Sequence, residues 1–383
     1  MRKICVITGT RAEFGLLRFV LLGLKEASDV HLQLIVTGAH LVPEYGNTYD
    51  EIHSADFQID AEVDMLLASN SSRAVGQSLG MGVIGITNAL SRLSPDIIVL
   101  LGDRYEALAA AQSAMILGIP IAHIHGGEAT EGLVDEAIRH SITKMSHVHF
   151  TAAEPFRKKV IQLGEHPSTV HNVGALGLDN IASLPHISRC EIEEFIGLKL
   201  DAPTLLVTYH PLTLDGCGTS SVDNLLMALA MQKDVRIVFT GANADAMGQD
   251  INARIRSFCK AKSETAVQVA SLGVNRYLNL MAISDSVIGN SSSGLLEAPF
   301  LGVPSVNIGD RQRGRLTGPA VVNCSNTTED IHAAIEKARS GELRAIAARR
   351  ETPYGKPGAS NKIVEILRTM NLSGILFKRF YKL

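Results

Sequence analysis

Acidic and histidine side chains stand directly behind two short apolar runs in the first half of this chain. The run 97–101 leads into Asp103, and the run 119–124 leads into His125 and Glu128. A carboxylate beside a histidine can take up and return protons during a reaction. The arrangement therefore predicts general acid–base chemistry at the ends of two neighbouring strands.

Each of these signals has a structural alternative. Asp103 could cap the helix expected after it, and Asp135 with Arg139, four residues apart, could form one solvated helix face. Neither alternative explains His123 and His125, which approach a Gly-Gly-Glu stretch. The two histidines share no further ligands at spacings typical of zinc, so no metal site is predicted.

The second half carries a different pattern, suited to a phosphate. Ser291, Ser292 and Ser293 follow the apolar run 287–289, where a helix start would offer hydroxyls and backbone N–H groups to an anion. Glu297, one helical turn further on, could accept hydrogen bonds from the two hydroxyls of a ribose. A polar, N-capped helix without a ligand is the alternative interpretation.

Other polar residues at strand ends complete a nucleotide pattern. The turn from Gly9 lacks the spacing of a dinucleotide fingerprint or a P-loop, although Arg11 could bind a phosphate if it does not simply lie in solvent. A helix is expected to follow from Leu16. The remaining candidates are Gly15, Arg104, His210, Asn243 and Arg311. The combined pattern predicts a nucleoside diphosphate held by the second half, whose reacting end meets carboxylates from the first half.

The elements that must position these residues are short β-branched runs alternating with longer helical stretches. This pattern is typical of an α/β protein with parallel sheets covered on both faces. We expect two Rossmann-like doubly wound domains facing a central cleft, with ligands beyond the carboxyl ends of the strands. The expected strands are 4–8, 32–37, 97–101, 119–124, 148–151, 170–173, 205–208, 236–240, 266–269, 287–289 and 305–308.

Three segments are predicted along the chain. Residues 1–178 form a first Rossmann-like domain with the catalytic residues for the reacting end of the ligand, and residues 179–360 form a second one that binds the nucleotide. Residues 361–383 contain an amphipathic helix and a basic, aromatic tail that we expect to pack back on the protein, rather than to bind a membrane surface or a partner.

Composition limits the function classes further. The 383 residues are 46% hydrophobic, with a net charge of −3 and no basic cluster, which excludes general nucleic-acid binding. Five widely spaced cysteines suit a cytoplasmic protein, and no signal peptide is evident. Residues 107–124 include no Asp, Glu, Lys or Arg, but a buried helix and strand explain them better than a membrane span.

Taken together and in order, these motifs resemble the hydrolysing UDP-N-acetylglucosamine 2-epimerases of bacterial sialic-acid biosynthesis. The resemblance covers nearly the whole chain. It implies a glycosyltransferase-B type of fold, no metal or nicotinamide cofactor, a homodimer or homotetramer, and release of UDP and N-acetylmannosamine. The motifs that carry it are Gly9–Gly15, Gly102–Glu106, His123–Glu128, Asp135–Lys144, His210–Pro211, Gly289–Glu297 and Asn307–Arg315.

The resemblance also implies roles. The C2 proton of the sugar is removed as UDP leaves C1, and water then adds to the resulting 2-acetamidoglucal with inversion at C2. The implied catalytic residues are Asp103, His125, Glu128, Asp135, Glu136 and His210. The implied UDP-sugar-binding residues are Arg11, Gly15, Arg104, Arg139, His210, Asn243, Ser291, Ser292, Ser293, Glu297 and Arg311.

One position departs from the wider family pattern. His125 stands where the non-hydrolysing branch and the animal bifunctional enzyme have a catalytic glutamate. Which of His125, Glu128 and Asp135 takes the C2 proton is therefore open, and our hypothesis divides the proton transfers between Asp103 and either His125 or Asp135.

Four other functions compete with this interpretation. The same reaction on a UDP-linked 2,4-diacetamido-2,4,6-trideoxy sugar, as in legionaminic-acid pathways, would leave the same motifs. A non-hydrolysing epimerase would return UDP to C1, and a glycosyltransferase of the same fold would transfer the sugar without touching the C2 proton. A non-catalytic UDP-sugar sensor is disfavoured because titratable groups are concentrated in the first half.

Overall fold

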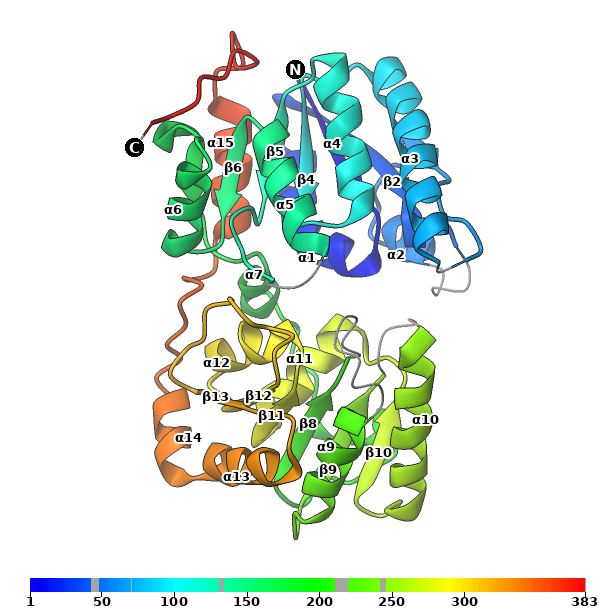
Figure 1. Ribbon diagram of the computed structural model, residues 1–383, viewed down its shortest axis with the longest axis vertical. Coiled ribbons are helices and arrows are strands. Elements are labelled where there is room, and N and C mark those ends of the chain that lie inside the picture. The colour runs from blue at the N-terminus through cyan, green and yellow to red at the C-terminus, as the bar shows by residue number, and fades with distance from the viewer. Residues whose placement is uncertain (43–47, 70, 131–133, 211–219, 242–245, 383) are drawn as a thin grey trace. The chain divides into compact units, whose positions relative to one another are not determined.

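The chain folds into two compact units. The computed structural model describes all residues except 43–47, 70, 131–133, 211–219, 242–245 and 383. Unit 1 comprises Met1–Asn180 together with Tyr354–Leu383, and unit 2 comprises Ile181–Pro353 (Figure 1). Unit 1 thus includes residues 179–180 and 354–360, which fall in the second domain of the expected division, together with the C-terminal helix.

Unit 1 is built on a seven-stranded parallel sheet in the order β3-β2-β1-β4-β5-β6-β7. Its strands are β1 (Arg2–Thr8), β2 (Val30–Thr37), β3 (Ala61–Val63), β4 (Ile97–Leu101), β5 (Ile121–Ile124), β6 (Val148–Thr151) and β7 (Val170–Asn172). Its helices are α1 (Arg11–Glu26), α2 (Thr48–Ser54), α3 (Ser72–Leu93), α4 (Tyr105–Leu117), α5 (Val134–Met145), α6 (Glu154–Gln162), α15 (Ala359–Thr369) and α7 (Gly177–Ala182), whose last two residues belong to unit 2.

Unit 2 repeats the design with a six-stranded parallel sheet in the order β10-β9-β8-β11-β12-β13. Its strands are β8 (Thr204–Thr208), β9 (Arg236–Thr240), β10 (Ala266–Val269), β11 (Ser286–Gly289), β12 (Ser305–Ile308) and β13 (Val321–Cys324). Its helices are α8 (Arg189–Ile196), α9 (Ser220–Ala230), α10 (Ala246–Ala261), α11 (Gly273–Ile283), α12 (Glu297–Leu301), α13 (Thr328–Arg339) and α14 (Gly341–Ala347).

Burial on both faces explains why the central strands could be predicted. All five residues of β4 are buried, and alternate residues enter two different apolar clusters on the two sides of the sheet. Such strands appear in a sequence as continuous apolar runs. The α/β class with two doubly wound parallel sheets is confirmed.

Two strands were missed, and both lie at the edge of a sheet. β3 has only three residues with an exposed glutamate in the middle, and no residue of β13 is fully buried. An edge strand needs neither a long apolar run nor strict burial, so neither segment stood out.

Each sheet has one point where the strand order reverses. In unit 1 this point lies between β1 and β4, and in unit 2 it lies between β8 and β11. Connections leave a doubly wound sheet in opposite directions there, which opens a crevice beyond the carboxyl ends of the strands. The loops after these four strands are therefore the places to look for function.

The first of these loops is shorter than expected. Helix α1 begins at Arg11, not near Leu16, because Thr10 caps it in a complete capping box with Glu13. The glutamate accepts hydrogen bonds from the backbone N–H groups of Gly9 and Thr10 at 2.8 and 3.2 Å. Gly15 is therefore a helical residue, and the predicted glycine loop is a tight turn.

The uncharged stretch 107–124 forms most of α4 and all of β5, as predicted. Helix α4 ends at Gly118, which adopts the left-handed conformation with φ 66° that favours glycine. Within the described part of the chain, no helix combines the length and the apolarity that crossing a bilayer requires.

The C-terminal segment is tied to unit 1 by helix α15 and by the tail after it. Ile363 and Leu367 of α15 are buried in the same apolar cluster as residues of α1 and of the sheet. In the tail, Lys378 donates to the carbonyls of Lys144 and Ser146 and forms an ion pair with Glu165 at 2.7 Å.

Helix α15 lacks a side-chain cap of its own, and Asp179 of α7 takes that place. The buried carboxylate accepts hydrogen bonds from the N–H groups of Gly358, Ala359 and Ser360 at 2.5, 3.3 and 2.7 Å. It also lies at the positive end of the helix dipole. One side chain thus holds residues that are far apart in the sequence.

We therefore predict that Asp179→Ala destabilises unit 1 by about 2 kcal/mol, because three backbone donors lose a charged acceptor. Hydrogen exchange of the amides at 358–363 should become faster than in the wild type. Asp64→Ala, at an exposed position of the same unit, is the control. Unchanged protection in Asp179→Ala would contradict the capping role.

Candidate functional site

A buried arginine organises the carboxyl edge of the unit 1 sheet. Arg139 of α5 is 1% exposed, and its guanidinium donates to the carboxylates of Asp103 and Glu136, to the hydroxyl of Thr130 and to the carbonyl of Glu128. The bonds to Glu136, Thr130 and Glu128 measure 2.7, 2.7 and 2.9 Å. The planar guanidinium can serve several acceptors at once, so it fixes their relative positions.

Asp103 occupies the turn directly after β4. Its carboxylate pairs with Arg139. About a quarter of the Asp103 side chain is exposed to solvent, so a ligand can reach it. The alternative that Asp103 caps α4 is wrong, because the N-cap residue is Arg104. Arg104 in turn forms a two-pronged ion pair with the buried Glu106, at 3.2 and 3.1 Å.

Glu136 is the second carboxylate held by Arg139. One oxygen also accepts from the N–H of Thr130 at 2.6 Å, and the other lies 3.1 Å from Nε2 of His140. Partial burial opposes ionisation, but the Thr130 N–H and the charges of Arg139 and His140 outweigh it and lower the pKa of Glu136. This carboxylate is therefore ionised and fixed.

Asp135 behaves in the opposite way. Burial, and then the negative charge of Asp103, raise the pKa of the Asp135 carboxyl above its ordinary value. Two acidic groups whose environments push their proton affinities apart are suited to different steps of one reaction. The solvated face proposed for Asp135 with Arg139 is wrong, because Arg139 points into the protein.

His125 and Glu128 form a third group at this edge. His125 lies directly beyond the end of β5, whereas His123 lies within the strand. Its backbone has φ 66°, which is uncommon for a residue other than glycine. Its Nδ1 lies 3.4 Å from Oε1 of Glu128, and both side chains are largely buried.

In unit 2, Asn290 has the organising position. This fully buried residue follows β11, and its side chain accepts from the N–H of His210 and donates to the carbonyl of His210, both at 2.8 Å. Its own carbonyl accepts from Gln312 at 2.8 Å and from Arg311 at 3.1 Å. Asn290 thereby joins the loops after β8, β11 and β12.

The preceding Gly289 has no possible replacement. Its φ is 141°, and a Cβ atom there would lie 1.9 Å from the carbonyl oxygen of Thr208 on the neighbouring strand. Only a residue without a side chain lets β8 and β11 approach each other in this way.

The predicted serine cradle forms a 3-10 turn, whereas a regular helix begins only at Glu297. Ser291 accepts from the N–H of Ser293 at 3.4 Å. Burial raises the pKa of Glu297, and its Oε2 has no hydrogen-bond partner among the described residues. An enclosed acceptor of this kind suits a ligand hydroxyl.

His210 presents a neutral imidazole beside a cation. Burial, and then the charge of Arg311, lower its pKa to about 4. Its Nδ1 is buried, and no described residue hydrogen-bonds to it. Together with Arg311, it offers a diphosphate both hydrogen-bonding capacity and positive charge.

The remaining predicted residues are dispersed or outside the described part of the chain. Arg11 forms an ion pair with Glu51 at 2.5 Å, with both side chains half exposed. Gly15 accepts from Asn180 through its carbonyl at 3.2 Å. Asn243 lies outside the described residues.

Several supporting residues were not predicted. Thr130, Asn290 and Gln312 follow strand ends, so their position was a usable signal, but their polarity is ordinary for a loop. Tyr277 lies within α11 and 3.5 Å from Thr208 Oγ1, and nothing in its local sequence marks it.

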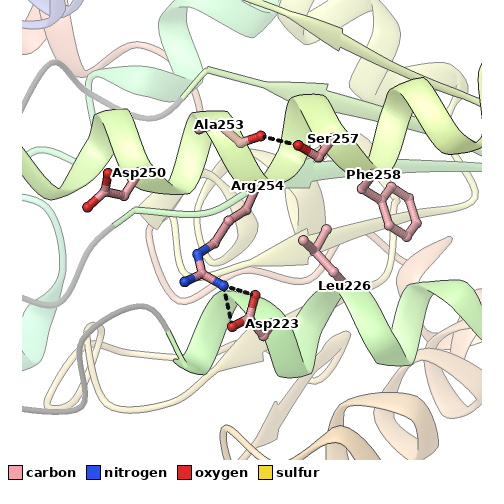
Figure 2. A pocket seen from close by; sticks show the side chains of 7 residues that line it. All are labelled: Asp223, Leu226, Asp250, Ala253, Arg254, Ser257 and Phe258. Atoms are coloured by element: carbon pink, nitrogen blue, oxygen red, sulfur yellow. Dashed lines mark hydrogen bonds and ion pairs between the residues drawn. The ribbon is translucent and has the colours of Figure 1, made fainter.

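A separate groove lies between α9 and α10, and the ion pair of Asp223 and Arg254 links the two helices there (Figure 2). None of the predicted site residues lines it. The described residues also include no group of three or more His, Cys, Asp or Glu side chains that could hold a metal ion.

Loss of the Arg139 fork should destabilise unit 1. We predict that Arg139→Lys lowers the free energy of unfolding by about 3 kcal/mol, because an ammonium group cannot serve four acceptors from the same place. Denaturant titration followed by circular dichroism measures the effect. Arg254→Lys, whose side chain is 42% exposed, should change stability by less than about 1 kcal/mol. Equal effects would contradict the prediction.

Unit 1 should lose stability between pH 6.5 and pH 4. Burial lowers the pKa of His40 to about 4, so the unfolded chain binds a proton in this range that the folded protein does not bind. Stability from this group is complete above pH 6.5 and falls as the pH falls, by about 2 kcal/mol at pH 5.

Urea unfolding at pH 7 and pH 5 checks this expectation. His40→Gln should lose about 2 kcal/mol less than the wild type over the same interval, because glutamine does not titrate. An identical pH dependence in the two proteins would show that His40 does not contribute.

Comparison with known proteins places this geometry in a family. A family model described as UDP-N-acetylglucosamine 2-epimerase matches residues 23–368. A Campylobacter jejuni protein named GDP/UDP-N,N'-diacetylbacillosamine 2-epimerase (hydrolyzing) is 40% identical over 100% of this chain and 99% of its own. The Escherichia coli polysialic acid biosynthesis protein P7 is 37% identical over 96% of this chain and 94% of its own.

Solved structures agree on the fold. The Neisseria meningitidis UDP-GlcNAc 2-epimerase bound to UDP-GlcNAc superposes with a TM-score of 0.80 at 19% identity, covering 95% of this chain and 99% of that one. Acinetobacter baumannii MurG superposes with a TM-score of 0.57 at 14% identity, covering 97% and 100%. The family model and the two relatives together show that the chain belongs to the hydrolysing UDP-N-acetylglucosamine 2-epimerase family.

Proposed function

We propose that this protein is a hydrolysing 2-epimerase that converts a UDP-linked 2-acetamido sugar into free UDP and the C2-inverted sugar. The observation that carries the proposal is the cluster of acidic groups around Arg139. The sequence of this chain aligns over its whole length with that of a protein named as a hydrolysing 2-epimerase. Family membership supports the reaction class, and the cluster supplies the proton chemistry that it requires.

The acidic groups divide the work according to their surroundings. No carbonyl acidifies the C2 proton of the sugar, so its removal must accompany departure of UDP from C1. Asp103, paired with Arg139, is suited to act as a base, whereas Asp135, with its raised pKa, is suited to deliver a proton. His125 with Glu128 is the alternative acid–base pair.

The groups of unit 2 are proposed to bind the UDP. Glu297 accepts hydrogen bonds from the ribose, Ser291 to Ser293 donate to the diphosphate, and His210 with Arg311 stabilises the charge that develops as UDP leaves. The Asn290 contacts hold His210 and Arg311 in place for this task.

The names of the relatives specify different sugar substrates. Two proteins, 40% and 33% identical, are named as N,N'-diacetylbacillosamine 2-epimerases, and another at 33% is named as a UDP-N-acetylglucosamine 2-epimerase. We propose the diacetylated 6-deoxy sugar as the substrate, ahead of the UDP-N-acetylglucosamine and sialic-acid role expected from the sequence. The predicted homo-oligomer and cytoplasmic location stay predictions.

NMR of the purified protein with each candidate tests the function. UDP-N,N'-diacetylbacillosamine, its GDP-linked counterpart and UDP-N-acetylglucosamine should be supplied separately. We expect a free sugar inverted at C2, together with free nucleotide, from the first. Turnover of UDP-N-acetylglucosamine alone would show that this nucleotide sugar, and not the diacetylated sugar, is the substrate. A C2-inverted nucleotide sugar without free nucleotide, or no reaction with any of them, would contradict a hydrolysing 2-epimerase.

Asp103→Asn should reduce kcat at least about 100-fold, because the amide cannot accept the proton, while the Kd for UDP stays within about twofold. Asp201→Asn, at a position 65% exposed in unit 2, is the control with the same chemical change. Near-normal turnover by Asp103→Asn would remove Asp103 from the mechanism.

A further inference from the structure

A buried histidine lies directly behind the turn after β4 that carries Gly102 and Asp103. His123 of β5 is completely buried, and its Nε2 lies 2.7 Å from the carbonyl oxygen of Gly102. Its Nδ1 lies 3.2 Å from Oγ1 of Thr143. Burial lowers its pKa to about 3, so the ring is neutral near pH 7.

These contacts determine the tautomer. A carbonyl oxygen can only accept, so Nε2 must carry the proton that is donated to Gly102. In a neutral ring Nδ1 is then an acceptor, and the Thr143 hydroxyl donates to it. Thr143 thus selects the form of His123 that can hold the Gly102 carbonyl.

The Gly102 carbonyl matters because of what shares its peptide plane. That plane also contains the N–H and the Cα of Asp103, so fixing the carbonyl fixes the base from which the Asp103 side chain extends. The N–H of Gly102 donates to the carbonyl of Ile124 at 3.0 Å, and its φ is 77°. Both polar groups of Gly102 are therefore anchored to β5.

Gly126 leaves room for the same hydrogen bond. A Cβ atom at this position would lie 3.0 Å from Oγ1 of Thr143 and 3.1 Å from Nδ1 of His123, closer than nearly all real contacts. Because its φ is outside the left-handed region, alanine is compatible with the backbone and would act through crowding alone.

We propose that His123 is a positioning residue for Asp103: with its tautomer set by Thr143, it holds the Gly102–Asp103 peptide in the geometry that proton transfer needs. This inference rests on the role proposed above for Asp103. It assigns His123 no contact with the substrate, and it gives Gly126 a purpose other than flexibility.

Two substitutions at position 123 separate positioning from packing. The amide nitrogen of glutamine can lie where Nε2 lies, whereas that of asparagine lies nearer to Nδ1. We expect His123→Asn to lower kcat about 100-fold and to change KM by no more than about twofold. The kcat of His123→Gln should be at least about tenfold higher than that of His123→Asn. Equal losses in both variants, or a loss expressed only in KM, would overturn the proposal.

Gly126→Ala provides a second test if the buried variants fold poorly. It should lower kcat without unfolding unit 1, whereas Gly80→Ala, at an exposed position of α3 with nothing within 4 Å of the new Cβ, should not change it. If kcat is unchanged in Gly126→Ala and the His123 tautomer is preserved, the space that Gly126 leaves is not required. If kcat is unchanged although the tautomer is lost, the proposal for His123 is overturned.

A double-mutant cycle shows whether His123 acts through Asp103. In the Asp103→Asn background, His123→Asn should cost less than about twofold in residual kcat, and a further 100-fold loss would overturn the proposal. Nitrogen-15 NMR of labelled histidine gives a readout without turnover. The neutral Nε2–H tautomer is expected at pH 7, and a charged ring or an Nδ1–H tautomer would overturn the proposal. Normal activity of Asp103→Asn alone would instead refute the proposed function.

Discussion

The carboxyl edge of the unit 1 sheet depends on the ion pairs that the buried guanidinium of Arg139 forms. A cation with almost no solvent contact is stable only when nearby acceptors compensate its charge, and Asp103 and Glu136 supply that compensation. The Thr130 N–H and the charge of Arg139 help to lower the pKa of Glu136, whereas burial and the negative charge of Asp103 raise the pKa of Asp135. Differences in proton affinity within one cluster thus follow from burial, hydrogen bonds and neighbouring charges acting together.

Unit 2 uses a neutral version of the same plan. Asn290 joins three strand-end loops through hydrogen bonds, and its amide side chain carries no charge of its own. In both units the organising side chain belongs to, or reaches, the point where the strand order reverses. The sheet supplies the crevice, and one buried polar residue gives the loops around it a defined geometry.

The sequence alone was sufficient for the fold class and for most of the strands, because doubly buried strands such as β4 appear as uninterrupted apolar runs. It also drew attention to Asp103, which directly follows such a run, and to the pair of Asp135 and Arg139, whereas Glu136 was expected only from the resemblance to the family. It could not show that Arg139 turns inward, because spacing along a helix is the same for a solvated pair and for a buried one. The edge strands β3 and β13 and the early start of α1 were missed for a related reason: hydrogen bonds to residues elsewhere, or a cap, decided them rather than apolar patterning.

The central claim is that the unit 1 carboxylates remove the C2 proton of the sugar as the nucleotide departs. The most direct measurement uses a substrate carrying deuterium at C2 in ordinary water, with mass spectrometry of the free sugar after a single turnover. Elimination followed by addition of water predicts that every released sugar has lost its deuterium and carries the inverted configuration. Released sugar that retains the deuterium would show that the bond to UDP is broken without chemistry at C2, and would contradict the account.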